Sequence, residues 1–314
     1  MYLGKLLQKS TIIRISRFII AVSLIVYVLF FVELQNIISS FKEVNLLLFS
    51  SALLLLIPNL FFQFLKWKYL LNSTINFYDN KKIIRSLFVG LSSGIFTPMR
   101  LGEYYGRSLD INKSSVTEIA ALTFIDKLFV LVSVVLIGGV FFVFFVSDFL
   151  HLNIIVKIGA YALMIILPLI PFLFIIFAKS HSAARFMKFK IFAKIAEKLS
   201  SLKTVNHTIL LVTFFYSVVI YFIYTLQFSL LLTAFESDSL IQQNFIMSNV
   251  IMFSKALIPQ ISFGELGVRE STSVFYSTFF NISGAAAFNA SILIFTINLL
   301  FPALIGFFFI TKKD

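Results

Sequence analysis

The sequence predicts an all-α integral membrane protein with about six full transmembrane helices plus two oppositely oriented re-entrant helical hairpins, arranged as an inverted repeat. Three observations lead to this prediction. Hydrophobic residues make up 59% of the 314 residues and charged residues only 13%, whereas a soluble globular chain carries about 25% charged residues. Several apolar stretches reach the roughly 17–25 residues that a spanning helix needs. Lys and Arg gather in alternate loops, which orients the spans.

Six stretches are long and apolar enough to cross a bilayer as single helices. They are residues 16–34, 45–65, 119–146, 154–178, 208–234 and 286–310. Two further apolar stretches, 83–99 and 245–263, are flanked by charged residues and interrupted by glycine or proline. Such interruptions free backbone groups that lipid cannot satisfy, so these two stretches are poor candidates for simple spans.

The distribution of Lys and Arg gives the orientation. Basic residues lie in the N-terminal arm, in residues 66–85 and 179–203, and at the C-terminus, whereas residues 35–45, 147–153 and 235–244 contain few or none. The positive-inside rule places the basic segments in the cytoplasm. We therefore expect a multi-pass protein of the cell inner (plasma) membrane with both termini cytoplasmic. The same rule explains the formal net charge of +12, so no nucleic-acid partner is expected.

This orientation leaves two segments that enter and leave the membrane on one side. Residues 83–117 lie between cytoplasmic segments, and residues 245–284 lie between segments that face out. Each is predicted to be a re-entrant helical hairpin, the first turning near Thr97-Pro98 and the second near Pro259. Residues 1–314 then form a single membrane domain whose halves, about 1–150 and 151–314, have the same order of elements in opposite orientations, as in many secondary transporters.

Each predicted hairpin carries a similar short motif. Residues 96–107 read FTPMRLGEYYGR, and residues 263–270 read FGELGVRE. Glu103 and Arg107 are four residues apart, as are Glu265 and Arg269, so each pair occupies one face of a helix. The two motifs are predicted to hold equivalent places in the two halves and to meet in space near the middle of the membrane.

The motif chemistry favours an anion. Interrupted helices at membrane depth either line a wet cavity or are buried in protein, and their N-termini attract phosphate, as arginine does. The carboxylates are expected to balance charge or contact an amine. Salt bridges that only pin the hairpins to the bundle are the structural alternative. The residues expected to interrupt the hairpin helices are Pro98, Gly102, Pro259, Gly264 and Gly267. The candidate substrate-binding or translocation residues are Arg100, Glu103, Arg107, Asp126, Lys127, Lys255, Glu265, Arg269 and Glu270.

Signals for enzyme chemistry are scarce in the sequence. It has no cysteine and only three histidines, and they form no pattern typical of a metal site. No nucleophile with a histidine partner, P-loop or Rossmann fingerprint is visible. We therefore expect no enzymatic activity, no cofactor and no bound metal.

The stretch TPMRLGEYYGR resembles a motif of the lysylphosphatidylglycerol synthase transmembrane family, also called the flippase-like domain family. Thr97, Pro98, Arg100 to Glu103 and Arg107 match the family pattern, whereas Met99 stands where glycine is usual. The second family motif resembles Pro259 followed by Gly264 and LGVRE, with Glu265 inserted. The segment FIDKLF at 124–129 is similar to a third, in which Lys127 is the basic member. The resemblance covers nearly the whole chain.

The resemblance implies lipid translocation without lipid synthesis. In the two-part members of the family a soluble aminoacyl-transferring domain follows the membrane part, and this chain is expected to lack that domain because it ends four residues after its last predicted span. The expected function is flippase- or scramblase-like movement of an anionic or zwitterionic phospholipid between leaflets. The alternatives are an ion-coupled transporter of a small anionic solute and a transferase that uses a lipid-linked donor. A homo-oligomer and a separate lipid-modifying enzyme are further candidate partners.

Overall fold

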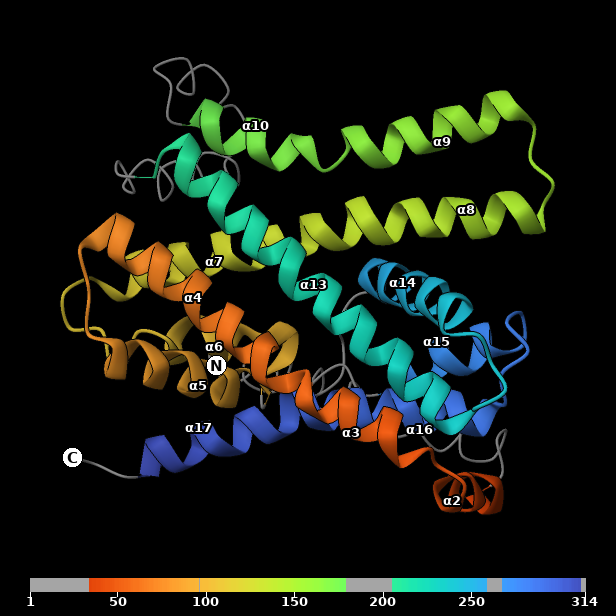
Figure 1. The fold of residues 1–314 in the computed structure, drawn as a ribbon. Coiled ribbons are helices and arrows are strands. Elements are labelled where there is room, and N and C mark those ends of the chain that lie inside the picture. The colour runs from red at the N-terminus through yellow and green to blue at the C-terminus, as the bar shows by residue number, and fades with distance from the viewer. Residues whose placement is uncertain (1–33, 96, 179–204, 259–266, 312–314) are drawn as a thin grey trace, which may run out of the picture.

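The computed structural model describes residues 34–95, 97–178, 205–258 and 267–311, and every regular element in them is helical. Figure 1 shows their arrangement. A 3₁₀ turn η1 (Pro98–Arg100) precedes α6, and π-helical turns η2 (Val134–Gly138) and η4 (Thr296–Leu300) join α7 to α8 and α16 to α17. The helices are α2 (Leu34–Lys42), α3 (Leu46–Leu54), α4 (Leu56–Ile75), α5 (Asn80–Ile95), α6 (Leu101–Gly106), α7 (Val116–Ser133), α8 (Gly139–Phe149), α9 (Ile154–Ile166), α10 (Leu169–Ala178), α13 (His207–Phe235), α14 (Ile241–Leu257), α15 (Val268–Ser277), α16 (Gly284–Phe295) and α17 (Phe301–Thr311).

Five helical stretches among the described residues are long and apolar enough to cross a membrane. They correspond to the last five predicted spans, so the prediction of an all-α, multi-pass membrane protein is confirmed. The first predicted span, 16–34, lies almost entirely outside the described residues. The five stretches are Leu46–Ile75, Val116–Phe149, Ile154–Leu173, His207–Phe235 and Gly284–Thr311.

Local capping explains where these long helices begin. The side chains of Asn45, Asn206 and Ser283 each accept a hydrogen bond from a backbone N–H in the first turn of the following helix. Ser115 and Glu118 form a reciprocal capping box at the start of α7. Caps of this kind satisfy amide groups that have no partner within the helix, so the starts of the spans are encoded in short stretches of sequence.

One predicted span was too short. The prediction ended it at residue 65 and placed Lys66 and Lys68 in a cytoplasmic loop, but α4 continues to Ile75. The helix ends at Asn76, whose backbone is left-handed with φ of 54°. The hydropathy of the sequence falls at Lys66, yet this lysine is buried in the protein. A charge is tolerated inside a membrane protein when a partner of opposite charge is present, and hydropathy does not register partners.

The first predicted hairpin corresponds to two antiparallel helices, α5 and α6, joined through η1, and its re-entry into the membrane stays a prediction. Its turn falls at Thr97–Arg100, as predicted, and Thr97 holds it closed because its hydroxyl accepts from the Gly102 amide at 2.7 Å. Met99 and Arg100 both have a left-handed backbone, with φ of 52° and 56°. That region favours glycine, which gives a physical reason for the glycine that the family pattern has at the position of Met99.

The second predicted hairpin corresponds to α14 and α15, which pack against each other. The hydroxyls of Ser254 and Tyr276 lie 2.8 Å apart across this pair. The predicted turn at Pro259 lies outside the described residues. Entry of the two hairpins from opposite faces of the membrane, and the inverted repeat itself, stay predictions.

The long helix that follows each hairpin packs against the other hairpin. After the first hairpin the chain forms α7, η2 and α8, and α8 packs on α14 of the second hairpin. After the second hairpin it forms α16, η4 and α17, and α17 packs on α5 of the first. The two π turns take part, since η2 contacts α14 and η4 contacts α5. Helix α13 runs across the helical bundle and contacts α3, α4, α7, α14 and α16 (Figure 1). The two hairpins therefore belong to one interlocked core.

Candidate charge cluster at the first hairpin

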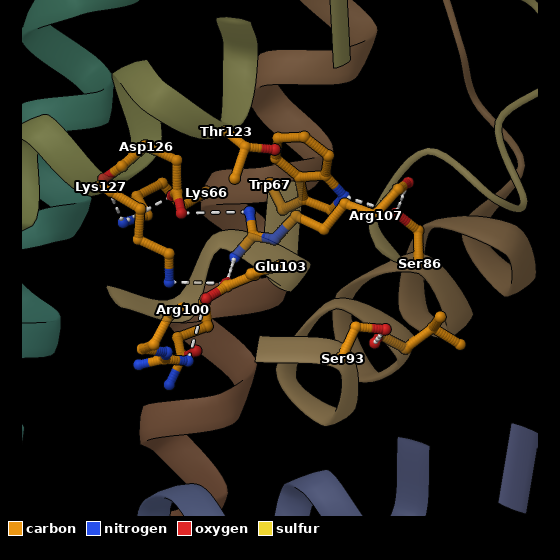
Figure 2. Close-up of polar contacts among 12 residues, drawn as sticks. Lys66, Trp67, Ser86, Ser93, Arg100, Glu103, Arg107, Thr123, Asp126 and Lys127 are labelled. Atoms are coloured by element: carbon orange, nitrogen blue, oxygen red, sulfur yellow. Dashed lines mark hydrogen bonds and ion pairs between the residues drawn. The ribbon is translucent and has the colours of Figure 1, made fainter. Parts of the chain in front are cut away.

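Six charged side chains from three helices meet beside the first hairpin. Figure 2 shows them joined into one continuous set of ion pairs, which we call the charge cluster. Five of its members were predicted as candidate site residues. The members are Lys66 on α4, Arg100, Glu103 and Arg107 on or beside α6, and Asp126 and Lys127 on α7.

Glu103 is the carboxylate at the centre of this cluster. Its side chain has no exposed surface and forms ion pairs with three cations. Arg107 lies 2.6 Å away, Lys127 2.7 Å and Arg100 3.0 Å. The four-residue spacing of Glu103 and Arg107, read from the sequence as one helix face, is thus an ion pair, to which α7 contributes another cation.

Asp126 is the second carboxylate, and it links Arg107 to Lys66. Its two oxygens lie 3.1 Å from an Arg107 nitrogen and 2.7 Å from the Lys66 ammonium. Lys66 also donates to the backbone carbonyl of Asp126 and to the hydroxyl of Ser217 on α13, both at 3.3 Å. All three charged side chains are almost completely buried, so this end of the cluster ties α4, α6, α7 and α13 together.

Trp67 and Ser86 hold Arg107 in place in addition to its ion pairs. The guanidinium lies 4.5 Å from the centre of the Trp67 ring, within the range of a cation–π contact. The Ser86 hydroxyl donates to the Arg107 carbonyl at 2.6 Å and accepts from the Trp67 indole at 3.3 Å. An arginine held at both its backbone and its side chain has little freedom to leave, so Arg107 is a fixed charge in this site.

Glycines in the hairpin act by allowing close approach. A Cβ on Gly102 would collide with the Ser93 carbonyl of α5, and one on Gly90 would collide with the Arg107 side chain. Gly102 was predicted to interrupt a helix. It instead lies within α6, so that prediction was wrong. The absence of a side chain at Gly102 serves to let α6 pack closely against α5. Pro98 does lie at the break, in the turn η1.

The charge cluster carries more positive than negative charge. Its four cations face two carboxylates, which leaves a formal excess of two positive charges among the described residues. The excess lies at one edge, because the side chains of Arg100 and Lys127 are 22% and 30% exposed whereas Glu103 is fully covered. A buried excess of one sign is costly unless a counter-charge approaches, so this edge is suited to an anion.

A second charged pair lies at the start of α15. Arg269 pairs with Glu270 at 3.3 Å and donates to the Tyr224 hydroxyl at 3.3 Å. Glu270 also accepts from the Gly267 amide at 2.6 Å, which caps α15. Gly267, the residue before α15, has φ of 89°, a region that favours glycine. Its predicted role in interrupting a helix stays a prediction, because residues 259–266 lie outside the described residues. Lys255 is buried on α14.

Three predicted members of the second hairpin, Pro259, Gly264 and Glu265, lie outside the described residues. The predicted pairing of Glu265 with Arg269, and the gathering of both motifs in one place, therefore stay predictions.

The structure does place the cluster and the second pair against the same helix. Lys66 reaches Ser217 of α13, and Arg269 reaches Tyr224, seven residues further along. Seven residues are about 10 Å of helix and nearly two turns, so the two contacts lie on one face. The Phe295 ring gives a further link, since it lies 5.3 Å from the Arg269 guanidinium and packs in one apolar cluster with Ile95 of the first hairpin.

Sequence reasoning missed Lys66 and Trp67. A signal for Lys66 was present, because Asn59, Gln63 and Lys66 are spaced by four and three residues. This spacing gives the apolar span one polar helical face, which continues the helix to Lys66. No comparable signal marks Trp67, whose contact with Arg107 joins residues from different helices. Among the described residues no group of three His, Cys, Asp or Glu side chains is placed to hold a metal ion.

Fold and site together define a multi-pass α-helical membrane protein with charged groups buried beside a broken hairpin. The lysylphosphatidylglycerol synthase TM region family matches residues 17–306. The match spans nearly the whole sequence, so the chain belongs to this family, and the resemblance seen in its motifs is confirmed. The family points to a membrane lipid-related function. Comparison with curated proteins and with solved structures gave no match.

Proposed function

We propose that this protein moves an anionic or zwitterionic phospholipid between the leaflets of the cell inner membrane and hydrolyses no ATP. The observation that carries the proposal is the excess of positive charge in the charge cluster, concentrated at the partly exposed Arg100 and Lys127. Both cations present N–H groups that pair well with phosphate oxygens. The phosphate of a lipid head group would supply the counter-charge that the cluster lacks.

The surroundings of this edge favour a lipid over a soluble anion. Phe124, Lys127 and Leu131 are spaced by three and four residues on α7, so they share one face, and the two apolar side chains are 37% and 46% exposed. Met99 and Leu101, on either side of Arg100, are 58% and 61% exposed. In a membrane such residues face acyl chains. The cationic edge therefore borders a surface that lipid tails can cover.

A charged site of this kind lowers the barrier to crossing. A lipid head group entering the hydrocarbon loses its water, and an unpaired charge there is costly. Fixed cations at membrane depth replace part of the lost hydration, and their carboxylate partners keep them ionised when no lipid is bound. Because the cations are both fixed and ionised, the head group can exchange its water for N–H donors that are already in place.

Two rival functions follow from the same residues. An ion-coupled transporter of a small anionic solute would use the same cations, but it would gain nothing from an apolar border at the cationic edge. A transferase with a lipid-linked donor would need carboxylates around a metal, and among the described residues no group of three His, Cys, Asp or Glu side chains is placed to hold one. The location in the inner membrane, cytoplasmic termini, a homo-oligomer and a separate lipid-modifying partner enzyme belong to the proposal as well.

Lipid exchange in liposomes tests the proposal. Purified protein is reconstituted with fluorescent phosphatidylglycerol, phosphatidylethanolamine or phosphatidylcholine, and a membrane-impermeant quencher reports the fraction in the outer leaflet. Exchange faster than in protein-free liposomes is expected for at least one head group, and it should be lost in Arg107→Gln. The matched control is Arg85→Gln on the same hairpin, because Arg85 pairs with Asp110 outside the cluster. No acceleration with any head group contradicts the proposal.

A further inference from the structure

Helix α13 carries a row of polar side chains that connects the charge cluster to Arg269. Ser217, Tyr221, Tyr224 and Gln227 are spaced by four, three and three residues, which confines them to about a third of the helix circumference. Over these ten residues the helix rises about 15 Å, roughly half the thickness of the hydrocarbon core. We call this row the polar face of α13.

Each member of the polar face bonds to a different part of the protein. Ser217 accepts from Lys66 of the charge cluster, and Tyr224 accepts from Arg269. Between them, the Tyr221 hydroxyl donates to the Asn249 side chain of α14 at 2.8 Å. Further along, Gln227 accepts from an asparagine of η4 at 2.7 Å and donates to a carbonyl of α3 at 2.8 Å.

Two threonine hydroxyls of the same helix behave differently. Thr213 and Thr225 are fully buried, yet their described hydrogen bonds go to carbonyls of α13 itself. A threonine that bonds to its own helix is the ordinary way to bury a hydroxyl in a membrane span. The cross-helix bonds of the polar face therefore distinguish it from these two threonines. Further along α13, beyond Gln227, Ser229 and Thr233 also bond across to α14.

Both π-helical turns also touch this face. Gly138 of η2 lies against Tyr221, since a Cβ at that glycine would be 2.8 Å from the tyrosine hydroxyl. The side-chain amide of Asn298 in η4 donates to Gln227, and the oxygen of the same side chain is buried with no hydrogen-bond partner. Single π turns within long helices are frequent at functional sites. Two of them on one polar face are a second observation, independent of the charges.

We propose that the polar face of α13 is the path by which a phosphate-bearing lipid head group passes between the charge cluster and Arg269, with Tyr221 and Tyr224 as the intermediate hydrogen-bond donors. This inference rests on the proposed function and names its substrate class and route. The two hydroxyls lie within two helical turns of both cationic groups, so the phosphate oxygens exchange one N–H or O–H donor for the next. Tyrosine supplies such a donor without adding another charge to the interior.

Ligand binding tests the inference independently of transport. The thermal midpoint of detergent-solubilised protein is followed while dihexanoyl-phosphatidylglycerol, phosphate-free dihexanoylglycerol or inorganic phosphate is added. The short-chain phosphatidylglycerol should raise the midpoint of the wild type, because a ligand that binds the folded state stabilises it. The Tyr221→Phe/Tyr224→Phe variant should need about tenfold more of this lipid for half the effect, since each lost bond to a charged group weakens binding. The matched control Thr225→Val should titrate like the wild type.

Each outcome decides a separate question. An unchanged half-saturating concentration in the double tyrosine variant overturns the inference, even when liposomes show lipid exchange and the proposed function stands. Equal stabilisation by dihexanoylglycerol overturns the requirement for phosphate, and equal stabilisation by inorganic phosphate overturns the lipid as its source. A tenfold shift in a protein that exchanges no lipid in liposomes supports the site and overturns the proposed transport.

Discussion

The pairing of Lys66 with Asp126 predicts strongly non-additive effects of substitution. The described ion pair of Lys66 is with Asp126 alone, whereas Asp126 also pairs with Arg107. Asp126→Asn leaves a buried lysine without its carboxylate, which typically costs about 3–5 kcal/mol. Lys66→Met leaves Asp126 paired with Arg107, so we expect a smaller loss of about 1–3 kcal/mol.

The double variant separates the pair from its surroundings. Independent effects would add to roughly 4–8 kcal/mol. In Lys66→Met/Asp126→Asn no lysine is left unpaired, and Arg107 keeps Glu103 at 2.6 Å. We therefore expect the double variant to be no less stable than Asp126→Asn, a coupling of about 1–3 kcal/mol.

Unfolding of the purified protein in mixed micelles, titrated with a denaturing detergent, measures these free energies. The control cycle is Arg85→Gln with Asp110→Asn, whose side chains are 27% and 17% exposed and whose coupling should stay below about 1 kcal/mol because solvent screens such pairs. Additive losses at Lys66 and Asp126, or equal coupling in both cycles, would refute the assignment of a tight buried pair.

Three further predictions concern the first hairpin. Gly102→Ala should destabilise the protein by about 1–3 kcal/mol through overpacking against α5, whereas Gly159→Ala, with nothing within 4 Å, should stabilise it by about 0.5–1 kcal/mol; similar thermal midpoints for both would contradict the close contact. Met99→Gly should be neutral or stabilising by up to about 1 kcal/mol, because it relieves a left-handed backbone with φ of 52°, and a clear fall in thermal midpoint would count against this reasoning. Asn80→Cys and Asn112→Cys, in a chain with no native cysteine, should react with an impermeant thiol reagent from the same side of the membrane, and labelling from opposite sides would rule out a re-entrant hairpin.

Under the proposed function, the formal excess of charge in the cluster serves to bind a ligand rather than to hold the fold together. A structural salt-bridge set is most stable when its charges balance, because each uncompensated buried ion is costly. Here Glu103 alone faces three cations, two of which keep part of their surface exposed. In the proposed function, an anionic ligand would remove the cost of this excess when it binds, as expected of a site that binds and releases its substrate.

The sequence by itself determined the class of the protein, most of its spans and the first turn. These features follow from short stretches of chain: an apolar run of sufficient length predicts a span, and a Thr-Pro turn ahead of Leu-Gly-Glu predicts a break. It also indicated that Asp126 and Lys127 are candidates for pairing with the hairpin, because charges are rare within spans and seek partners.

Only the tertiary structure decided which charges share a site and how they balance. Lys66 looked like a loop residue until the fold placed it beside Asp126, which lies 60 residues away, and Ser217, which lies 151 residues away. The polar face of α13 is likewise hidden in a sequence of scattered Ser, Tyr and Gln, because what distinguishes Tyr224 from an ordinary buried hydroxyl is its contact with Arg269. Hydropathy and spacing describe one helix at a time, whereas the free energy of a buried charge depends on the partners that packing brings to it.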